Sequence, residues 1–284
     1  MNLTPPQQQT LDSLVSDLSA IPGVAAIVIG GSHCMGLAGP GSDIDLGLYY
    51  DPGSPFEVAA VRGVAARYQA EGTATVTDFY GWGPWVNGGA WLQTATGEVD
   101  LVYRNLRQVR ETIDKAARGI WENDYSQQPP YGFSNVIYLA ETHFCIVRHD
   151  PGGVMAALKA AVAVYPPALK ASIVQQALWS AEFTLWQADA FARKQDVYNA
   201  TGCFTRAQKA LVDALYALNE WYPMGDKHAL RQLQTAPTGP EQVVTQLEAV
   251  WTQPTLTGKA AKLRQVFEQV KSLAGAAYQP YFEL

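Results

Sequence analysis

The sequence predicts an α+β fold in which an N-terminal domain with a small mixed sheet is followed by an all-α helical bundle. Residues 1–150 combine short β-type apolar runs with helical stretches, and Gly and Pro punctuate them. From residue 154 onward, the chain is rich in Ala, Leu, Gln and Lys at helical spacing. The turn-forming segment Asp150-Pro151-Gly152-Gly153 separates the two textures. We therefore expect two domains, 1–150 and 151–284.

Apolar periodicity and turn residues define the elements of the N-terminal domain. Leu11, Leu14 and Leu18 form one stripe, which predicts a helix over residues 7–18. A short helix is expected to begin at Gly30-Gly31-Ser32, directly after the first strand. The other expected helices are 56–70 and 106–117, and the expected strands are 24–29, 43–50, 73–80, 91–94 and 98–103, the last two forming a hairpin. This order is typical of an α/β arrangement with a small mixed sheet.

The C-terminal part shows helical periodicity almost throughout. The expected helices are 169–194, 204–221, 226–233, 240–251 and 257–273. Short connections between helices of this length predict a bundle.

Composition restricts the class of protein. The hydrophobic fraction of 48% supports a core, and the charged fraction of 16% is not that of a disordered chain. No apolar run approaches the roughly 20 residues of a membrane span, and the Gln-rich start lacks the order of a secretory signal. We expect a soluble, cytoplasmic protein without membrane partners.

Charge and cysteine usage argue against two further classes. The net charge is −6 and no Lys/Arg cluster is present, so a nucleic-acid partner is not expected. Cys34, Cys145 and Cys203 lie far apart without a CxxC pair, and the histidines show no ligand spacing. We expect buried thiols and no thiolate metal site.

A pair of carboxylates stands on one predicted strand. Side chains alternate along a strand, so Asp43 and Asp45 share one face while Ile44, Leu46 and Leu48 can enter the core on the other. Like charges two residues apart repel each other. A divalent cation would remove that repulsion, since Mg²⁺ binds carboxylate and phosphate oxygens.

Two further features extend the pair into a candidate reaction site. The turn Gly30-Gly31-Ser32 follows a β-type run, and its glycines allow close backbone approach to a phosphate while Ser32 adds a hydroxyl. The strand Glu98 to Tyr103 offers a third acid, and an adjacent strand would bring Asp100 to the pair. We favour Asp100 because Glu98 is next to the Gly97 turn. A phosphate cradle beside carboxylates indicates phosphoryl or nucleotidyl transfer.

The motif resembles a known superfamily. Gly30-Gly31-Ser32, a spacer of ten residues and Asp43-Ile44-Asp45-Leu46 are similar to the DNA polymerase β-type nucleotidyltransferases, which include aminoglycoside and lincosamide nucleotidyltransferases. Residues 83–92 and 99–104 resemble a bacterial branch with a helical C-terminal domain, as does the stretch from Tyr216 to Asn219 with Lys227. The motif core covers residues 24–104, and the helical part is similar only loosely.

The resemblance implies an N-terminal nucleotidyltransferase catalytic domain and a helical substrate- or nucleotide-binding domain. Asp43 and Asp45 would hold two Mg²⁺ ions, with Asp100 joining them at the catalytic metal. Gly31 and Ser32 would bind the β- and γ-phosphates of an NTP, and a substrate hydroxyl would displace pyrophosphate. Ser42 and Lys227 are further candidate nucleotide-binding residues.

The chain departs from this pattern after the turn. Many relatives carry a basic residue there, whereas this chain has His33-Cys34-Met35. Phosphate charge would then be met by the metals or by the helical part, where Lys209, Lys227 and Arg206 are candidates. His33 could also contact the nucleotide.

Several residues allow both a structural and a functional interpretation. Trp82, Trp85 and Trp91 could stack on a base or sugar, although aromatic residues at this density are more often core or loop anchors. Asn219 could cap a helix or contact substrate.

We expect an enzyme that transfers a nucleoside monophosphate, most simply AMP from ATP, to a small hydroxylated molecule. One alternative is a toxin-like nucleotidyltransferase that modifies a protein or tRNA. Another is a non-catalytic nucleotide-binding module, which would have little reason to gather three carboxylates.

Overall fold

The computed structural model describes residues 3–39 and 41–281. By residue contacts, the chain divides into two compact units. Unit 1 comprises Met1–Asp114 and Asn135–Val164, and unit 2 comprises Lys115–Ser134 and Tyr165–Leu284. The α+β class is confirmed, with a mixed sheet in the N-terminal part and a helical region after it. The predicted domain division at residue 150 stays a prediction.

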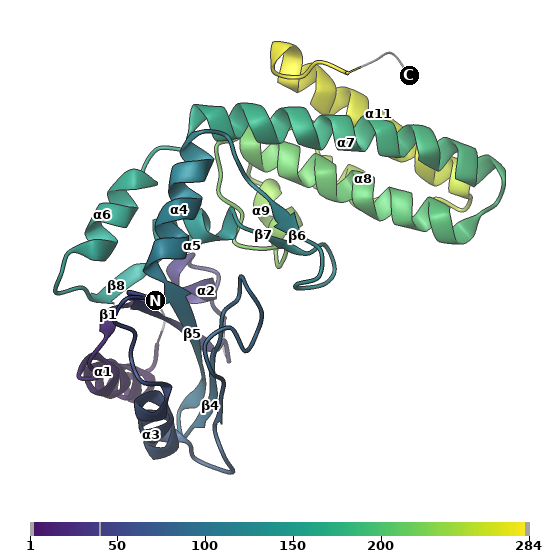
Figure 1. Ribbon diagram of the computed structural model, residues 1–284. Helices are drawn as coiled ribbons and strands as arrows, with labels where there is room; N and C mark the ends of the chain where they lie inside the picture. Colours follow the sequence, from purple (N-terminus) through teal and green to yellow (C-terminus); the bar gives the residue numbers. More distant parts are fainter. Residues whose placement is uncertain (1–2, 40, 282–284) are drawn as a thin grey trace. The chain divides into compact units, whose positions relative to one another are not determined.

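Unit 1 is built on a six-stranded mixed sheet with the strand order β3-β4-β5-β2-β1-β8 (Figure 1). Strands β2 and β5 pair in parallel at its centre, and the other neighbours pair antiparallel. The bounds are β1 Val24–Ile29, β2 Ile44–Tyr50, β3 Thr75–Val76, β4 Gly89–Thr94, β5 Gly97–Asn105 and β8 Ile146–His149.

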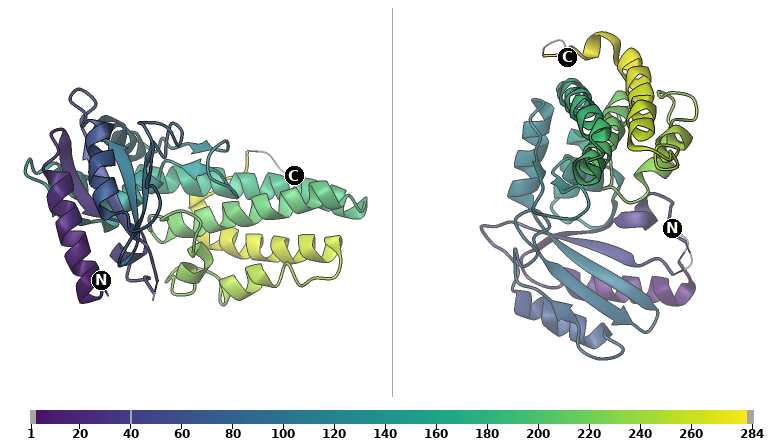
Figure 2. Two further views of the ribbon diagram at one scale, coloured as in Figure 1. Left: turned by 90° about the horizontal axis from the view of Figure 1, so that it is seen from below. Right: turned by 90° about the vertical axis from the view of Figure 1, so that its right-hand side faces the viewer.

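One face of this sheet is covered by helices α1 (Pro5–Ser19) and α3 (Val58–Tyr68) (Figure 2, right). Their apolar stripes share a core with Ile44, Leu46 and Leu48 of β2, all of which are buried. The predicted alternation of β2 is therefore confirmed. Asp43 and Asp45 alternate with these apolar residues, so their carboxylates point away from this core.

Local signals account for most element bounds in unit 1. Thr4 begins α1 with a capping box, and β1 and α4 (Leu106–Ala117) have the predicted bounds. The predicted strand 73–80 is wrong outside Thr75–Val76. After Val76 the chain enters a loop in which the Tyr80 amide donates to Asn87 Oδ1 instead of to a strand.

Elements between residues 118 and 161 were not predicted individually. They are β6 (Asn123–Asp124), β7 (Phe133–Ser134), α5 (Ile137–Phe144), β8 and α6 (Val154–Ala161). Strands of two to four residues are too short for periodicity to reveal them.

Unit 2 consists mainly of three long helices that pack on one another, together with the β6–β7 hairpin (Figure 1). The long helices are α7 (Pro167–Arg193), α8 (Val197–Leu218) and α11 (Leu256–Ala274), and shorter ones are α9 (Ala229–Leu233) and α10 (Val243–Glu248). Asn219 closes α8, donates to Leu215 O at 2.7 Å and exchanges hydrogen bonds with the Thr238 backbone. Its structural interpretation therefore holds. Among the described residues, no helix has the length and apolarity to cross a membrane.

Candidate active site

Parallel pairing of β2 and β5 brings the predicted acids together. Asp45 is directly opposite Asp100 in the register, and Asp43 lies just before β2. One carboxylate oxygen from each of the three residues lies within 4.8 Å of the others. All three side chains are half-buried. The structure therefore confirms that Asp43, Asp45 and Asp100 form one cluster, whereas Glu98 is exposed on the same strand.

The glycine turn is built against the same cluster. The Gly30 amide donates to Asp45 O at 2.9 Å, which joins the end of β1 to the start of β2. Gly31 has a φ of +56°, and a Cβ placed on it would lie 1.7 Å from Asp45 Oδ2. A side chain at this position would displace the Asp45 carboxylate, and glycine adopts this left-handed backbone conformation without steric cost. Gly31 and Asp45, which are separated in the sequence, are therefore in direct contact in the folded chain.

Two polar side chains of helix α2 (Gly31–Cys34) lack a hydrogen-bond partner among the described residues. Ser32 Oγ is buried and has no hydrogen-bond partner among the described residues, and the same holds for both ring nitrogens of the buried His33. Buried polar groups are normally hydrogen-bonded. Both side chains therefore have unused hydrogen-bonding capacity, and they follow Gly31, the residue that contacts Asp45.

The two other predicted nucleotide contacts are Ser42 and Lys227. Ser42 Oγ accepts from the Gly39 amide at 3.0 Å and thus stabilises its own loop. Lys227 is exposed in unit 2, just before α9. Their binding roles stay predictions.

Lys209 has a different environment from the one expected of a phosphate ligand. Its ammonium lies 2.5 Å from Asp213 and 3.5 Å from Asp226, and both carboxylates raise its pKa against the lowering effect of burial. Its charge is therefore already compensated. Arg206 is exposed on the same helix, α8, and makes no ion pair in the described part of the chain.

Burial and neighbouring charge weaken the acidity of Asp100. Desolvation, then Asp43, then Glu98 raise the pKa of Asp100 from 3.8 to about 6. A carboxyl with this pKa is still mostly ionised at neutral pH, yet it accepts a proton more readily than an ordinary Asp. A cation bound by the cluster would favour its ionised form.

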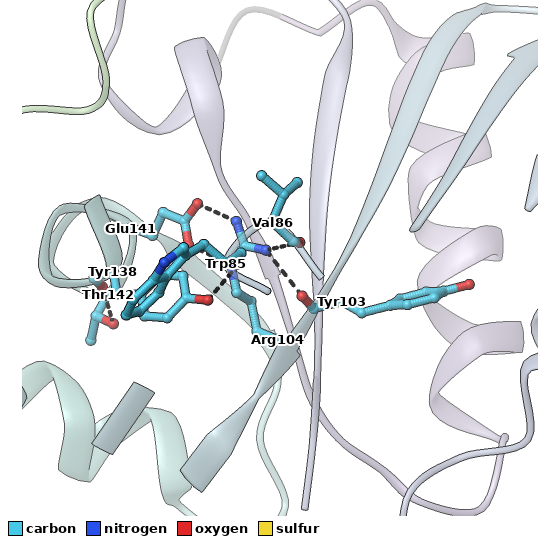
Figure 3. Close-up of polar contacts among 7 residues, drawn as sticks. All are labelled: Trp85, Val86, Tyr103, Arg104, Tyr138, Glu141 and Thr142. Atoms are coloured by element: carbon cyan, nitrogen blue, oxygen red, sulfur yellow. Dashed lines mark hydrogen bonds and ion pairs between the residues drawn. The ribbon is translucent and has the colours of Figure 1, made fainter. Parts of the chain in front are cut away.

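A buried ion pair at the other end of β5 was not predicted. Arg104 is 5% exposed, and its guanidinium forms two hydrogen bonds with Glu141 of α5, at 2.6 and 2.7 Å (Figure 3). It also donates to Val86 O at 2.9 Å and lies over the Tyr138 ring. Arg104 and Asp100 are an even number of residues apart on β5, so the sequence already indicated that both side chains project to the same face of the sheet. Its partner Glu141 could not be identified because α5 was not predicted.

The tryptophans of the Gly-rich loop have two different environments. Trp82 stacks on Trp91 with a centroid separation of 4.8 Å and an interplanar angle of 23°. Trp85 packs edge-on against Tyr138, whose hydroxyl donates to Trp85 O. Trp85 therefore serves as a loop anchor, as the structural interpretation expected.

Comparison with known proteins addresses the N-terminal part. Residues 11–86 match the family described as "Nucleotidyltransferase domain". This range contains Gly31, Ser32, Asp43 and Asp45 and ends before Asp100. A solved nucleotidyltransferase-like protein from Exiguobacterium sibiricum 255-15 is similar at 9% identity and a TM-score of 0.47, over 94% of this chain and 75% of that chain. No curated protein matches the chain.

Proposed function

Because the N-terminal part is a DNA polymerase β-like nucleotidyltransferase domain with its three carboxylates in one cluster, we propose that the protein is a Mg²⁺-dependent nucleotidyltransferase. It transfers a nucleoside monophosphate, AMP from ATP, to a hydroxyl of a small molecule and releases pyrophosphate. The observation that carries this proposal is the approach of the three acids to within 4.8 Å.

The donor set fits a divalent metal. Three carboxylates at this separation offer the hard oxygen ligands that Mg²⁺ prefers, and a bound cation would offset the repulsion between them. Asp43, Asp45 and Asp100 would hold two ions. Bound Mg²⁺ would neutralise charge on the phosphates and on the leaving pyrophosphate.

Gly31 and Ser32 are proposed to bind the β- and γ-phosphates. Gly31 contributes backbone next to the Asp45 carboxylate, and Ser32 Oγ is a buried hydroxyl without a hydrogen-bond partner in the described part of the chain. Ser42 and Lys227 are assigned as further nucleotide contacts, in line with the resemblance. In this assignment residues 1–150 form the catalytic domain and residues 151–284 contribute substrate or nucleotide contacts.

The proposed reaction is an in-line displacement at phosphorus. The acceptor oxygen bonds to the α-phosphorus, the bond between the α-phosphorus and the α,β-bridging oxygen breaks, and pyrophosphate leaves. The proton of the acceptor hydroxyl passes to a carboxylate oxygen of Asp100, the third acid of the cluster.

The test is nucleotide transfer from labelled ATP with Mg²⁺ to a panel of small hydroxylated molecules. Asp43→Asn should abolish transfer, whereas Glu111→Gln, the same change of a carboxyl to an amide on the exposed face of α4, should retain it. Transfer that persists in Asp43→Asn would contradict the proposal.

Two further measurements separate the alternatives. If mass spectrometry of a treated lysate finds nucleotide only on proteins or tRNA, the acceptor is macromolecular. If calorimetry finds ATP binding equally tight with and without Mg²⁺, and no transfer occurs, the chain is a binding module.

A further inference from the structure

A row of side chains crosses the face of the unit 1 sheet that lies opposite the core shared with α1 and α3. Asp45 on β2 is opposite Asp100 on β5, and Asp100 is opposite Trp91 on β4. Residues directly opposite in neighbouring strands project to the same face, with Cβ atoms about 5 Å apart in an antiparallel pair. Trp91 is therefore the neighbour of Asp100 on the side away from Asp45.

Trp91 exposes more than half of its surface. The residue is 54% exposed, while Ala90 and Leu92 on either side of it are buried in the core. Trp91 therefore presents part of its surface to solvent on the strand next to that of Asp100.

Trp82 holds Trp91 from one side. The two indole rings are stacked, and Trp82 itself lies over Gly89, where a Cβ would be only 2.6 Å from Trp82 Cζ3. Gly89 thus makes room for Trp82 on the same sheet face. The pair forms a two-ring aromatic platform, defined here as Trp82 and Trp91.

The loop that carries Trp82 is firmly anchored. The Trp82 amide donates to Asn87 O at 2.7 Å, and buried Asn87 donates to the Tyr50 hydroxyl. Arg104 also donates to Val86 O in the same loop (Figure 3). A preorganised platform loses little conformational entropy when a ligand binds.

The charge around the platform restricts what can bind. Glu98, two residues before Asp100 and on the same face, accepts from Gln93 at 2.7 Å and stays exposed. The three aspartates would be compensated by the bound metal, so the charge of Glu98 is the one that bears on the ligand at this edge of the site. That charge disfavours an anionic ring, whereas the indole faces accept an uncharged or a cationic ring.

We propose that Trp91, supported by Trp82, binds the acceptor of the reaction, and that this acceptor is an uncharged or cationic ring compound bearing a hydroxyl. The ring stacks on Trp91 and its hydroxyl reaches Asp100. That the ligand is the acceptor rests on the proposed function, whereas ring binding by the platform is independent of it. Saturated rings with an apolar C–H face and aromatic rings share this stacking chemistry.

The binding test does not depend on catalysis. The full-length protein is labelled with 5-fluorotryptophan, and the Trp91 resonance is assigned by its loss in Trp91→Phe. The probes are myo-inositol, benzyl alcohol and the acyclic polyol sorbitol. A shift of the Trp91 signal with either ring probe, and none with sorbitol, supports the site and separates saturated from aromatic rings.

The same spectra contain the opposing results. No shift with either ring probe, or an equal shift with sorbitol, overturns the ring-binding site. The resonance of Trp186, which is 49% exposed on α7, serves as the control for non-specific effects and should not move.

The catalytic test uses labelled ATP and a metabolite extract as the source of acceptor. Trp91→Ala should raise the acceptor KM about tenfold, equivalent to about 1.4 kcal/mol, with the KM for ATP unchanged. Trp91→Phe should retain most of the affinity, and Trp186→Ala should behave as wild type. An acyclic or anionic product acceptor, or an unchanged acceptor KM in Trp91→Ala, overturns the assignment.

The two proposals fail in different ways. If the wild type transfers no nucleotide, the proposed function fails and the fluorine spectra alone decide whether Trp91 binds rings. If transfer occurs and depends on Asp43 but not on Trp91, the proposed function stands and the platform does not.

Discussion

Replacing Asp100 by Asn should stabilise the metal-free protein at neutral pH. The folded-state pKa of Asp100 is raised from 3.8 to about 6, so the folded protein binds this proton more tightly than the unfolded chain. Keeping Asp100 charged therefore destabilises the fold. The penalty is absent below the unfolded pKa, grows between 3.8 and about 6, and is complete above that range.

The size of the effect follows from the pKa shift and the exposure of the side chain. A rise of about two units corresponds to about 3 kcal/mol at 1.36 kcal/mol per unit. Asp100 is only half-buried, and solvent screening reduces this to roughly 1–2 kcal/mol. For a domain of this size, the melting temperature should rise by roughly 3–6 °C.

Calorimetric melting of the full-length protein in EDTA measures the change at pH values of about 7 and about 4. Asp100→Asn should melt at a higher temperature than wild type near neutral pH and at the same temperature in acid. Mg²⁺ should raise the melting temperature of the wild type more than that of the variant. Glu111→Gln, an exposed acid on α4, should change stability little under all conditions.

Two results would refute this reasoning. If Asp100→Asn melts at a lower temperature than wild type in EDTA near neutral pH, the charge of Asp100 does not destabilise the fold. If Mg²⁺ stabilises both proteins equally, Asp100 contributes nothing to the metal site.

Two further substitutions test the positions of Asp45 and Glu141. Gly31→Ala should abolish the stabilisation by Mg²⁺ in a melting assay, because its Cβ would displace the Asp45 carboxylate. The control Gly36→Ala has a φ of +70° and open space around it, so it should cost only about 1–2 kcal/mol of backbone strain and keep the Mg²⁺ response. An equal loss of the Mg²⁺ response in both variants would contradict the steric argument. Arg104→Met should lower the free energy of unfolding of unit 1 by about 3–5 kcal/mol in urea unfolding, because it leaves Glu141 partly buried without its partner. Adding Glu141→Leu should recover part of that loss. A double variant no more stable than Arg104→Met would exclude uncompensated charge as the cause.

Much of the site could be predicted from short stretches of sequence. The β-type alternation of β2 was enough to separate its acids from its core residues, and turn chemistry identified the glycine pair. Asp100 required one further assumption, that its strand neighbours β2. That pairing joins residues more than 50 positions apart, and only the register in the folded sheet establishes it.

The tryptophans and the ion pair show why the rest was not predictable. A period-two pattern tells which residues share a face, but it does not tell which strands lie side by side. Trp91 became the neighbour of Asp100 through the β4–β5 register, and Arg104 found Glu141 on a helix that periodicity did not reveal. In each case the partner is distant in the chain.

Local sequence was therefore sufficient for the α+β class, the two carboxylates of β2 and the glycine turn, because side-chain alternation and backbone freedom are properties of a few consecutive residues. Long-range packing was needed to bring Asp100 to Asp43 and Asp45, to place the Asp45 carboxylate against Gly31 and to stack Trp82 on Trp91. These contacts depend on strand order and register, which are set by the burial of the whole core rather than by any single segment.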